Sequence, residues 1–246
     1  LPQFGERGTR RIGTYADSPV TVADGRPLAD GLDIEREGFV LARHDTAVGD
    51  FYDEDEVRRV YYPEVEALVK QATGARRVVM FDHTIRAADE NTQSAHGVRE
   101  PVHIAHNDYT EASGPQRVRD ILPDEADDLL SRRFAVVQVW RPIKGPVEQQ
   151  PLAICDAQSI GPGDLIETDL VYDDRLGEIL QIAHSPGQRW YYFPRMARDE
   201  ALIFKCYDSL TDGRARFTAH SAFHDPTTAP NAPERVSIEA RTLVFY

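Results

Sequence analysis

The chain of 246 residues carries 41 acidic and 28 basic side chains besides its histidines, a formal net charge of −13 at pH 7. Nucleic-acid binding needs a basic face, so this charge argues against a nucleic-acid partner. No apolar run approaches the roughly 20 residues of a membrane span, and the N-terminus lacks the charged-then-apolar pattern of a secretory signal. We therefore expect no membrane association and a cytoplasmic location.

The first hundred residues combine short strands with one amphipathic helix. Apolar side chains recur at helical spacing within Asp53–Thr73, and Gly74 marks the expected end of that helix. The polar segment Ala87–Glu100 lacks apolar periodicity and is expected to be a mobile loop. Short strands are expected at Arg11–Tyr15, Gly38–Arg43 and Arg77–Asp82.

The rest of the chain is dominated by strand patterns. Helices are expected within Gly114–Leu130, with Pro123 opening the second of them. Helices followed by a dense run of strands favour a mainly β fold, a double-stranded β-helix (a cupin-like jelly roll) with N-terminal and flanking helices. Strands are expected at Phe134–Trp140, Leu152–Asp156, Glu178–Ala183, Trp190–Phe193 and Ala201–Tyr207, before two last strands that hold His220 and Arg235.

Glycines and prolines, 16 of each, are spread along the chain without forming a linker, and no internal repeat is present. We therefore expect a single domain over residues 1–246, with an N-terminal extension over 1–100 and a jelly-roll core over 101–246. Cys155 and Cys206 each lie in an apolar run, which favours buried, reduced thiols. The sequence leaves the choice between a monomer and a homodimer open.

His106 and Asp108 follow the strand-like segment Pro101–Ala105. Positions i and i+2 of a strand point the same way, so both side chains can enter one cavity. A histidine from a distant strand, His220, would complete a set of two imidazoles and one carboxylate, which suits non-haem Fe(II). His224 has the same strand parity and is the rival ligand, although the turn at Asp225 places it nearer the rim. The pair alone also fits a surface turn or a hydrogen-bonded core histidine.

The last strand of the chain alternates strictly between apolar and polar side chains. Val236, Ile238 and Ala240 form its apolar face, while Arg235 and Ser237 begin the polar face. An arginine and a serine two positions apart can together bind a carboxylate. The alternative is a solvated edge strand on which the arginines of that face pair with its glutamate.

These motifs belong to an ordered series that extends from about Tyr61 to the C-terminus. The series consists of His106-x-Asp108, Val139-Trp-Arg-Pro142, Pro151-Leu-Ala-Ile-Cys-Asp156, Trp190-Tyr-Tyr-Phe-Pro194, Phe204-Lys-Cys-Tyr-Asp-Ser209, Thr218-Ala-His220 and Arg235-x-Ser237-Ile-Glu-x-Arg241. In this combination the chain resembles the cephem-methoxylase and gibberellin-desaturase-like group of the Fe(II)/2-oxoglutarate oxygenases, which also includes fungal secondary-metabolite oxygenases. It departs from the group at Ala219, where proline is usual, and at Val236, where an acidic residue is common.

The resemblance implies an enzyme that binds Fe(II), 2-oxoglutarate and O₂, with His106, Asp108 and His220 as the metal ligands. It also implies that the distal carboxylate of 2-oxoglutarate meets Arg235 and Ser237. Such an enzyme oxidises an unactivated C–H bond of a small natural product or amino-acid-derived metabolite by hydroxylation, desaturation or ring formation, with release of succinate and CO₂. The substrate itself is not indicated by any motif.

Other polar and aromatic residues have both a functional and a structural interpretation. Lys205 interrupts an apolar strand and needs an anionic partner, which is either the cosubstrate or substrate, or a structural carboxylate such as Asp208 or Glu200. Further candidates are Arg241 at the cofactor site and Arg141, Trp140, Tyr192 and Arg86 at the substrate pocket.

Two functions outside this class remain open from the residues alone. A cupin-like metalloprotein could use the same facial ligands without 2-oxoglutarate, and a non-catalytic jelly-roll module could bind an anion. Formation of succinate from 2-oxoglutarate separates the predicted oxygenase from both alternatives.

Overall fold

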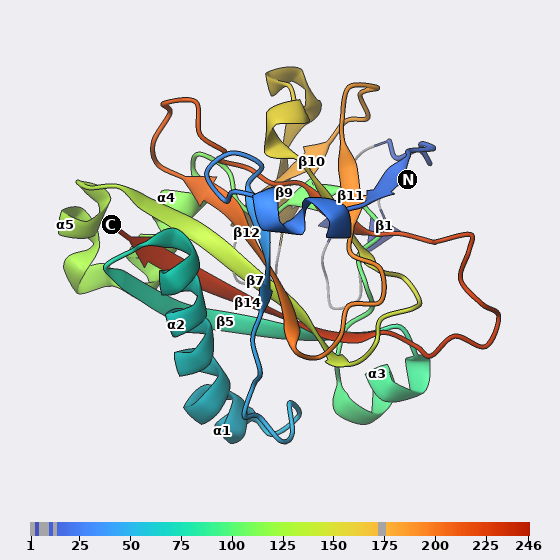
Figure 1. Ribbon diagram of the computed structural model, residues 1–246. Helices are drawn as coiled ribbons and strands as arrows, with labels where there is room; N and C mark the ends of the chain where they lie inside the picture. The colour runs from blue at the N-terminus through green and yellow to red at the C-terminus, as the bar shows by residue number, and fades with distance from the viewer. Residues whose placement is uncertain (1–2, 5–9, 12–13, 172–175) are drawn as a thin grey trace.

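Strands make up most of the regular secondary structure of the computed structural model, which describes residues 3–4, 10–11, 14–171 and 176–246. They form two sheets, sheet A and sheet B, that face each other as expected for a jelly roll (Figure 1). All described strand pairs are antiparallel except β11 with β3. The mainly β prediction is therefore confirmed.

Most strands of sheet A are short, whereas four of the five strands of sheet B have nine residues or more. In spatial order, sheet A consists of β1 (Gln3–Phe4), β2 (Arg10–Arg11), β9 (Leu165–Val171), β10 (Leu176–Ile182), β6 (His106–Asn107), β13 (His220–Ala222), β8 (Leu152–Cys155), β11 (Trp190–Tyr192) and β3 (Val22–Asp24). Sheet B consists of β4 (Phe39–Arg43), β12 (Glu200–Asp208), β7 (Phe134–Lys144), β14 (Val236–Phe245) and β5 (Arg77–Ala87). Both edge strands of sheet B come from the first hundred residues.

One continuous helical segment covers the outer face of sheet B (Figure 1). It begins at α1 (Glu54–Glu56), where the Asp53 carboxylate accepts hydrogen bonds from two backbone N–H groups of the first turn. It continues through a π-helical turn, Val57–Tyr61, into α2 (Tyr62–Thr73). Gly74 ends it at φ 69°, as the sequence predicts. The other helices are α3 (Glu90–His96), α4 (Ser113–Ile121) and α5 (Ala126–Leu130), with 3₁₀ turns at Arg26–Gly31, Pro123–Glu125, Ala157–Ser159 and Pro162–Asp164.

The alternation along β14 separates the core from the interior of the sandwich. Val236, Ile238 and Ala240 belong to the apolar cluster that packs on α2. Ser237, Glu239 and the other odd-numbered residues therefore point the opposite way, towards sheet A. The polar face is buried between the sheets, so β14 is not the solvated edge strand of the alternative interpretation.

Four sequence-based expectations need correction. Ala87–Glu100 is not a loop, because Asp89 caps α3 by accepting from the Thr92 N–H and Gly97 ends it at φ 63°. Pro101–Ala105, expected to be a strand before the His-x-Asp pair, is not one, and β6 consists of His106 and Asn107 alone. The strand β9 was not anticipated, because half of its side chains are exposed and polar residues interrupt its pattern. The expected strand Arg11–Tyr15 lies partly outside the described residues, and only its first residue belongs to a strand, β2.

Among the described residues, none of the helices has both the length and the apolar character needed to cross a membrane.

Gly38 lies next to the edge strand β4 of sheet B and packs closely against Thr218, in the segment before His220. Its φ is +90°, a conformation that favours glycine, and a Cβ there would clash with Thr218 Oγ1. Its carbonyl accepts hydrogen bonds from Lys205 N (2.8 Å) and from Thr218 Oγ1 (3.2 Å). Gly38 therefore fixes two segments of the sandwich at once.

We predict that Gly38→Ala lowers the free energy of unfolding by about 1–3 kcal/mol, because it combines backbone strain with a steric clash. Chemical denaturation of the metal-free protein measures this. Gly31→Ala is the matched control, since nothing lies within 4 Å of its added Cβ, and we expect a change within about 0.5 kcal/mol. Equal losses in the two variants would contradict the assignment.

Candidate metal centre

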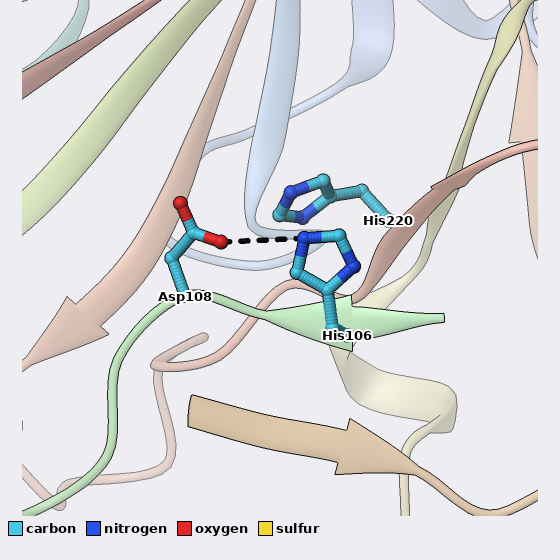
Figure 2. A group of neighbouring side chains, drawn as sticks. All are labelled: His106, Asp108 and His220. Carbon is cyan, nitrogen blue, oxygen red and sulfur yellow. Dashed lines mark ion pairs between the residues drawn. The ribbon is translucent and has the colours of Figure 1, made fainter. Parts of the chain in front are cut away.

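Three side chains from sheet A converge between the two sheets (Figure 2). His106 on β6 is paired directly with His220 on β13, so both imidazoles project from the same face. Asp108 follows β6 immediately, and its Oδ1 lies 3.3 Å from His106 Nε2. One donor atom from each of the three residues lies within 4.8 Å of the others. The structure thus brings together the three residues that were predicted as metal ligands.

The two imidazoles are oriented by backbone carbonyl groups. His106 Nδ1 lies 2.7 Å from the Ile104 carbonyl oxygen, and His220 Nδ1 lies 3.3 Å from the Thr218 carbonyl oxygen. A donating Nδ1–H leaves the lone pair on Nε2, the nitrogen that His106 turns towards Asp108. Burial and the neighbouring His106 lower the pKa of His220 to about 4, so its imidazole is neutral at pH 7, as metal binding requires.

Asp108 is held in its charged form. Burial by itself would raise the pKa of its carboxyl group, but Arg241 and His106 lower that pKa well below its usual range. Arg241 Nε donates to Asp108 Oδ2 at 3.0 Å, and Gln138 Nε2 donates to the same oxygen. The other oxygen, Oδ1, is left facing His106.

The donor set fits non-haem Fe(II). Two imidazole nitrogens and one carboxylate oxygen on one side of a site, with the remaining coordination positions open, are characteristic of Fe(II) oxygenases. The rival ligand His224 instead stacks on His103, with ring centroids 4.5 Å apart. The His220 ring packs against Phe204 from sheet B at 4.8 Å, which places it in the interior.

Arg235 is a buried cation without an ion-pairing carboxylate in the described part of the chain. Its side chain is 2% exposed, and it donates to Ser237 Oγ (3.1 Å) and to the Gln150 carbonyl oxygen (2.6 Å). The guanidinium lies 5.1 Å from the Trp140 ring, whose buried Nε1 has no hydrogen-bond partner there. Burial and Arg86 lower the pKa of Arg235 to about 9, so it stays charged at pH 7. These donors fit the carboxylate of an anionic cosubstrate.

Arg241, expected at the cofactor site, is fully occupied by protein carboxylates. Besides Asp108, it contacts Glu239 at 2.8 Å and Asp82 at 3.2 Å. Glu239 also pairs with Arg86 at 2.9 Å, and Arg86 donates to the Glu100 carbonyl oxygen. In the structure the partners of Arg241 are therefore Asp108, Glu239 and Asp82, and its role at the cofactor site stays a prediction.

Lys205 lies on the other side of sheet B. It is fully buried and forms ion pairs with Glu35 and Asp208, each at 2.9 Å. Its neighbour Phe204 packs on His220, so strand alternation directs Lys205 away from the centre. Of the two interpretations of Lys205, the structure thus contains the ion pair with Asp208. We therefore do not include Lys205 among the residues around the candidate metal centre.

Of the four residues predicted at the substrate pocket, two face the interior of the sandwich and two do not. Trp140 and Arg86 lie on the inner face of sheet B, beneath Arg235 and beside Glu239 respectively. Arg141 donates to the carbonyl oxygens of His44 and Arg198 on the α2 side. Tyr192 alternates with Tyr191, which shares the face of His220, so Tyr192 points outwards and packs on Phe223. Arg141 and Tyr192 therefore do not line the site.

Two glutamines near the centre were not anticipated. Gln138 is the one polar residue in the buried run Phe134–Trp140. A polar side chain inside an apolar strand needs a buried hydrogen-bond partner, so the sequence could have marked Gln138 as a candidate. Gln181 is paired with His106 across β10 and β6, and its Nε2 donates to the Tyr15 hydroxyl at 2.8 Å. No local pattern marks Gln181, because its neighbour is set by sheet register.

Known proteins share this architecture. A family model described as an oxidoreductase/YMDC permease-like domain matches residues 4–245. The Fe(II)/2-oxoglutarate-dependent dioxygenase nvfI of Aspergillus novofumigatus is 35% identical over 90% of this chain and 81% of its own length. The solved structure of the iron and alpha-ketoglutarate-dependent endoperoxidase NvfI superimposes with a TM-score of 0.86 at 33% identity, covering 92% of this chain and 85% of that one. The chain belongs to the Fe(II)/2-oxoglutarate-dependent oxygenases.

A second relative, the hydroxylase/desaturase efuI of Hormonema carpetanum, is 31% identical over 99% of this chain and 88% of its own length. The enzyme therefore uses Fe(II), 2-oxoglutarate and O₂, as predicted, and it is neither a cupin-like protein without 2-oxoglutarate nor a non-catalytic module. The narrower cephem-methoxylase and gibberellin-desaturase-like assignment stays a prediction.

We predict that Lys205→Met lowers the free energy of unfolding by about 3 kcal/mol, because it leaves buried carboxylates without one cation. The affinity of the folded variant for 2-oxoglutarate should stay within about twofold of the original. Arg43→Met is the control, since its side chain is 74% exposed in its pair with Asp199 and should contribute less than about 1 kcal/mol. A large loss of 2-oxoglutarate affinity in Lys205→Met would return this lysine to the cofactor site.

Proposed function

We propose that His106, Asp108 and His220 bind the Fe(II) of this oxygenase, and that Arg235 with Ser237 binds the distal carboxylate of 2-oxoglutarate. The observation that carries the proposal is the buried Arg235, a cation whose protein contacts are a hydroxyl and a carbonyl group. It immediately precedes β14, the strand that reaches Asp108 through Arg241. One strand thus connects the anion site to the metal ligands.

The chain's own residues bind and orient the reactants. Iron and 2-oxoglutarate supply the oxidising chemistry when bound. The unpartnered Nε1 of Trp140 provides a further N–H donor next to Arg235, and the apolar cluster around Phe204 and Ile154 excludes water on one side of His220. Arg241 is reassigned from the cosubstrate to Asp108.

The substrate is proposed to be a small natural-product or amino-acid-derived metabolite, oxidised at an unactivated C–H bond. Relatives are named hydroxylase/desaturase, dioxygenase and endoperoxidase, so the outcome of the reaction varies among similar chains. Hydroxylation, desaturation and ring formation all begin with the same iron centre. In this chain the centre is flanked by Gln181 with Tyr15 on one side and by Arg86 with Glu239 on the other.

We also retain the proposal of a single domain over residues 1–246, in which the 1–100 extension contributes β4 and β5 to sheet B. The net charge of −13 supports an enzyme that acts without nucleic acid. A cytoplasmic location without membrane association is part of the same proposal. The choice between a monomer and a homodimer is settled by measuring the mass of the protein in solution.

Replacement of metal ligands tests the iron site. We predict that Asp108→Ala and His220→Ala each weaken Fe(II) binding by roughly 100-fold or more and abolish succinate formation from 2-oxoglutarate, because a three-ligand site loses one of its donors. His224→Ala should retain binding and turnover within about threefold. Anaerobic Fe(II) titration and succinate assays provide the measurements. Full activity in His220→Ala with loss in His224→Ala would identify His224 as the ligand.

Replacement of Arg235 tests the anion site. Arg235→Met should raise the Kd of 2-oxoglutarate by about 30-fold to 1,000-fold, the range expected when a buried charge loses its partner. Fe(II) affinity should remain unchanged, which separates the two sites. Calorimetric titration of the iron-loaded protein under anaerobic conditions measures both. Arg189→Met, which removes a half-exposed guanidinium paired with Asp156, is the control. If Arg86→Met weakens 2-oxoglutarate binding and Arg235→Met does not, the anchor is Arg86.

A further inference from the structure

We infer that Gln138 and Arg241 are positioning residues that restrict Asp108 to binding the metal through one oxygen. The inference rests on the proposed function, because it takes Asp108 as an iron ligand. It goes beyond that function by assigning a role to two residues of sheet B that do not touch the metal themselves.

The position of Asp108 is not fixed by the strand that carries His106. β6 ends at Asn107, so Asp108 lies just beyond the hydrogen-bonded ladder. Its carboxylate is instead held from the opposite sheet, by Gln138 on β7 and Arg241 on β14. These two residues are direct partners across β7 and β14, which places their side chains next to each other on the inner face. The ligand therefore owes its orientation to sheet B.

The two carboxylate oxygens have different surroundings. Oδ2 accepts from both Gln138 Nε2 and Arg241 Nε, which occupies its lone pairs in the plane of the carboxylate. Oδ1 faces His106 Nε2 at 3.3 Å and receives no hydrogen bond from sheet B. A carboxylate held in this way presents one oxygen to the metal. If both oxygens bound, they would take a coordination position that 2-oxoglutarate or O₂ needs.

Gln138 is a polar residue at a position where its neighbours along the strand are apolar. It is fully buried between the apolar neighbours Val137 and Val139, and its Oε1 has no hydrogen-bond partner in the described part of the chain. A buried amide with one unsatisfied group destabilises a fold. Its Nε2 donates to Asp108 Oδ2, and the side chain otherwise interacts with the buried Cys206 thiol. This is the arrangement expected of a residue retained for the metal ligand rather than for stability.

Arg241 is itself held rigidly. Its guanidinium also donates to Glu239 Oε1 (2.8 Å) and to Thr84 Oγ1 (3.1 Å), while Arg86 holds Glu239 from the other side. The chain Arg86–Glu239–Arg241–Asp108 alternates in charge along the inner face of sheet B. A donor fixed at several points can direct one oxygen more sharply than a free surface side chain.

Cobalt(II) is the probe for the test, because it binds the same ligands and its visible absorption reports coordination number without turnover. Gln138→Met keeps the volume of the side chain and removes its donor. We expect the Kd of Co(II) to rise by about 10-fold to 100-fold, the range for residues that orient a metal ligand, and the visible spectrum to change. Gln149→Met, which removes a glutamine bonded to the Ala232 carbonyl, should leave both unchanged.

A second pair of variants keeps the inference testable if Gln138→Met fails to fold. Arg241→Lys keeps the charge and one donor, so its spectrum should lie between those of the original protein and Arg241→Met, whereas a purely structural role predicts altered stability with an unaltered spectrum. A Co(II) spectrum and affinity unaffected by Gln138→Met, or by Arg241→Met where that glutamine variant does not fold, would overturn the inference while the iron site stands. Unaltered Co(II) binding in Asp108→Ala would instead overturn the proposed function.

Discussion

The whole site depends on one constraint: charges placed between two β-sheets must find partners there. On the inner face of sheet B, Arg86, Glu239 and Arg241 form a chain of ion pairs that ends on Asp108 of the opposite sheet. Every charge in that chain is balanced by a neighbour. Arg235, on the same face, is the surplus cation. A buried guanidinium without a carboxylate partner is costly, and an anion bound beside it would offset that cost.

The sandwich positions its ligands by register rather than by proximity in sequence. A transverse row of sheet A runs through Tyr191, Ile154, His220, His106 and Gln181, each paired with the next. Directly paired residues share a face, so the two histidines enter the interior together although they lie far apart in the chain. Sheet B faces this row with Phe204, Gln138 and Arg241. The candidate metal site therefore lies between the two histidines of sheet A and a facing row of sheet B, which supplies one apolar group and two hydrogen-bond donors.

Local sequence patterns predicted those features of the site that depend on which face of a strand a residue occupies. The alternation of β14 is a property of a strand, and the structure places its polar face accordingly. His106 lies on β6, whereas Asp108 follows that strand and reaches the same site from beyond the ladder. The partner of a buried charge is a different matter. Lys205 pairs with Glu35, and Arg241 with Asp108, across separations that no periodicity encodes. Arg235 and Arg241 have the same parity along the sequence. Only their three-dimensional neighbours show that Arg241 is paired with carboxylates, whereas Arg235 contacts a hydroxyl and a carbonyl group. The helix α3 was readable from Asp89 and Gly97, whereas β9 was concealed by its exposed, polar half.

The short strand β6 explains why the two sheets and the metal site depend on each other. With two residues, β6 can fix His106 through pairing on both sides, but it cannot fix Asp108, which follows the ladder. The aspartate is held only when sheet B lies against sheet A, with Gln138 and Arg241 in reach. Any loosening of the sandwich would therefore release one ligand of three. By linkage, a metal that binds all three ligands stabilises the closed sandwich in the same proportion. The burial of polar and charged groups between the sheets, unfavourable for a core, is what makes the geometry of the iron site a property of the whole fold.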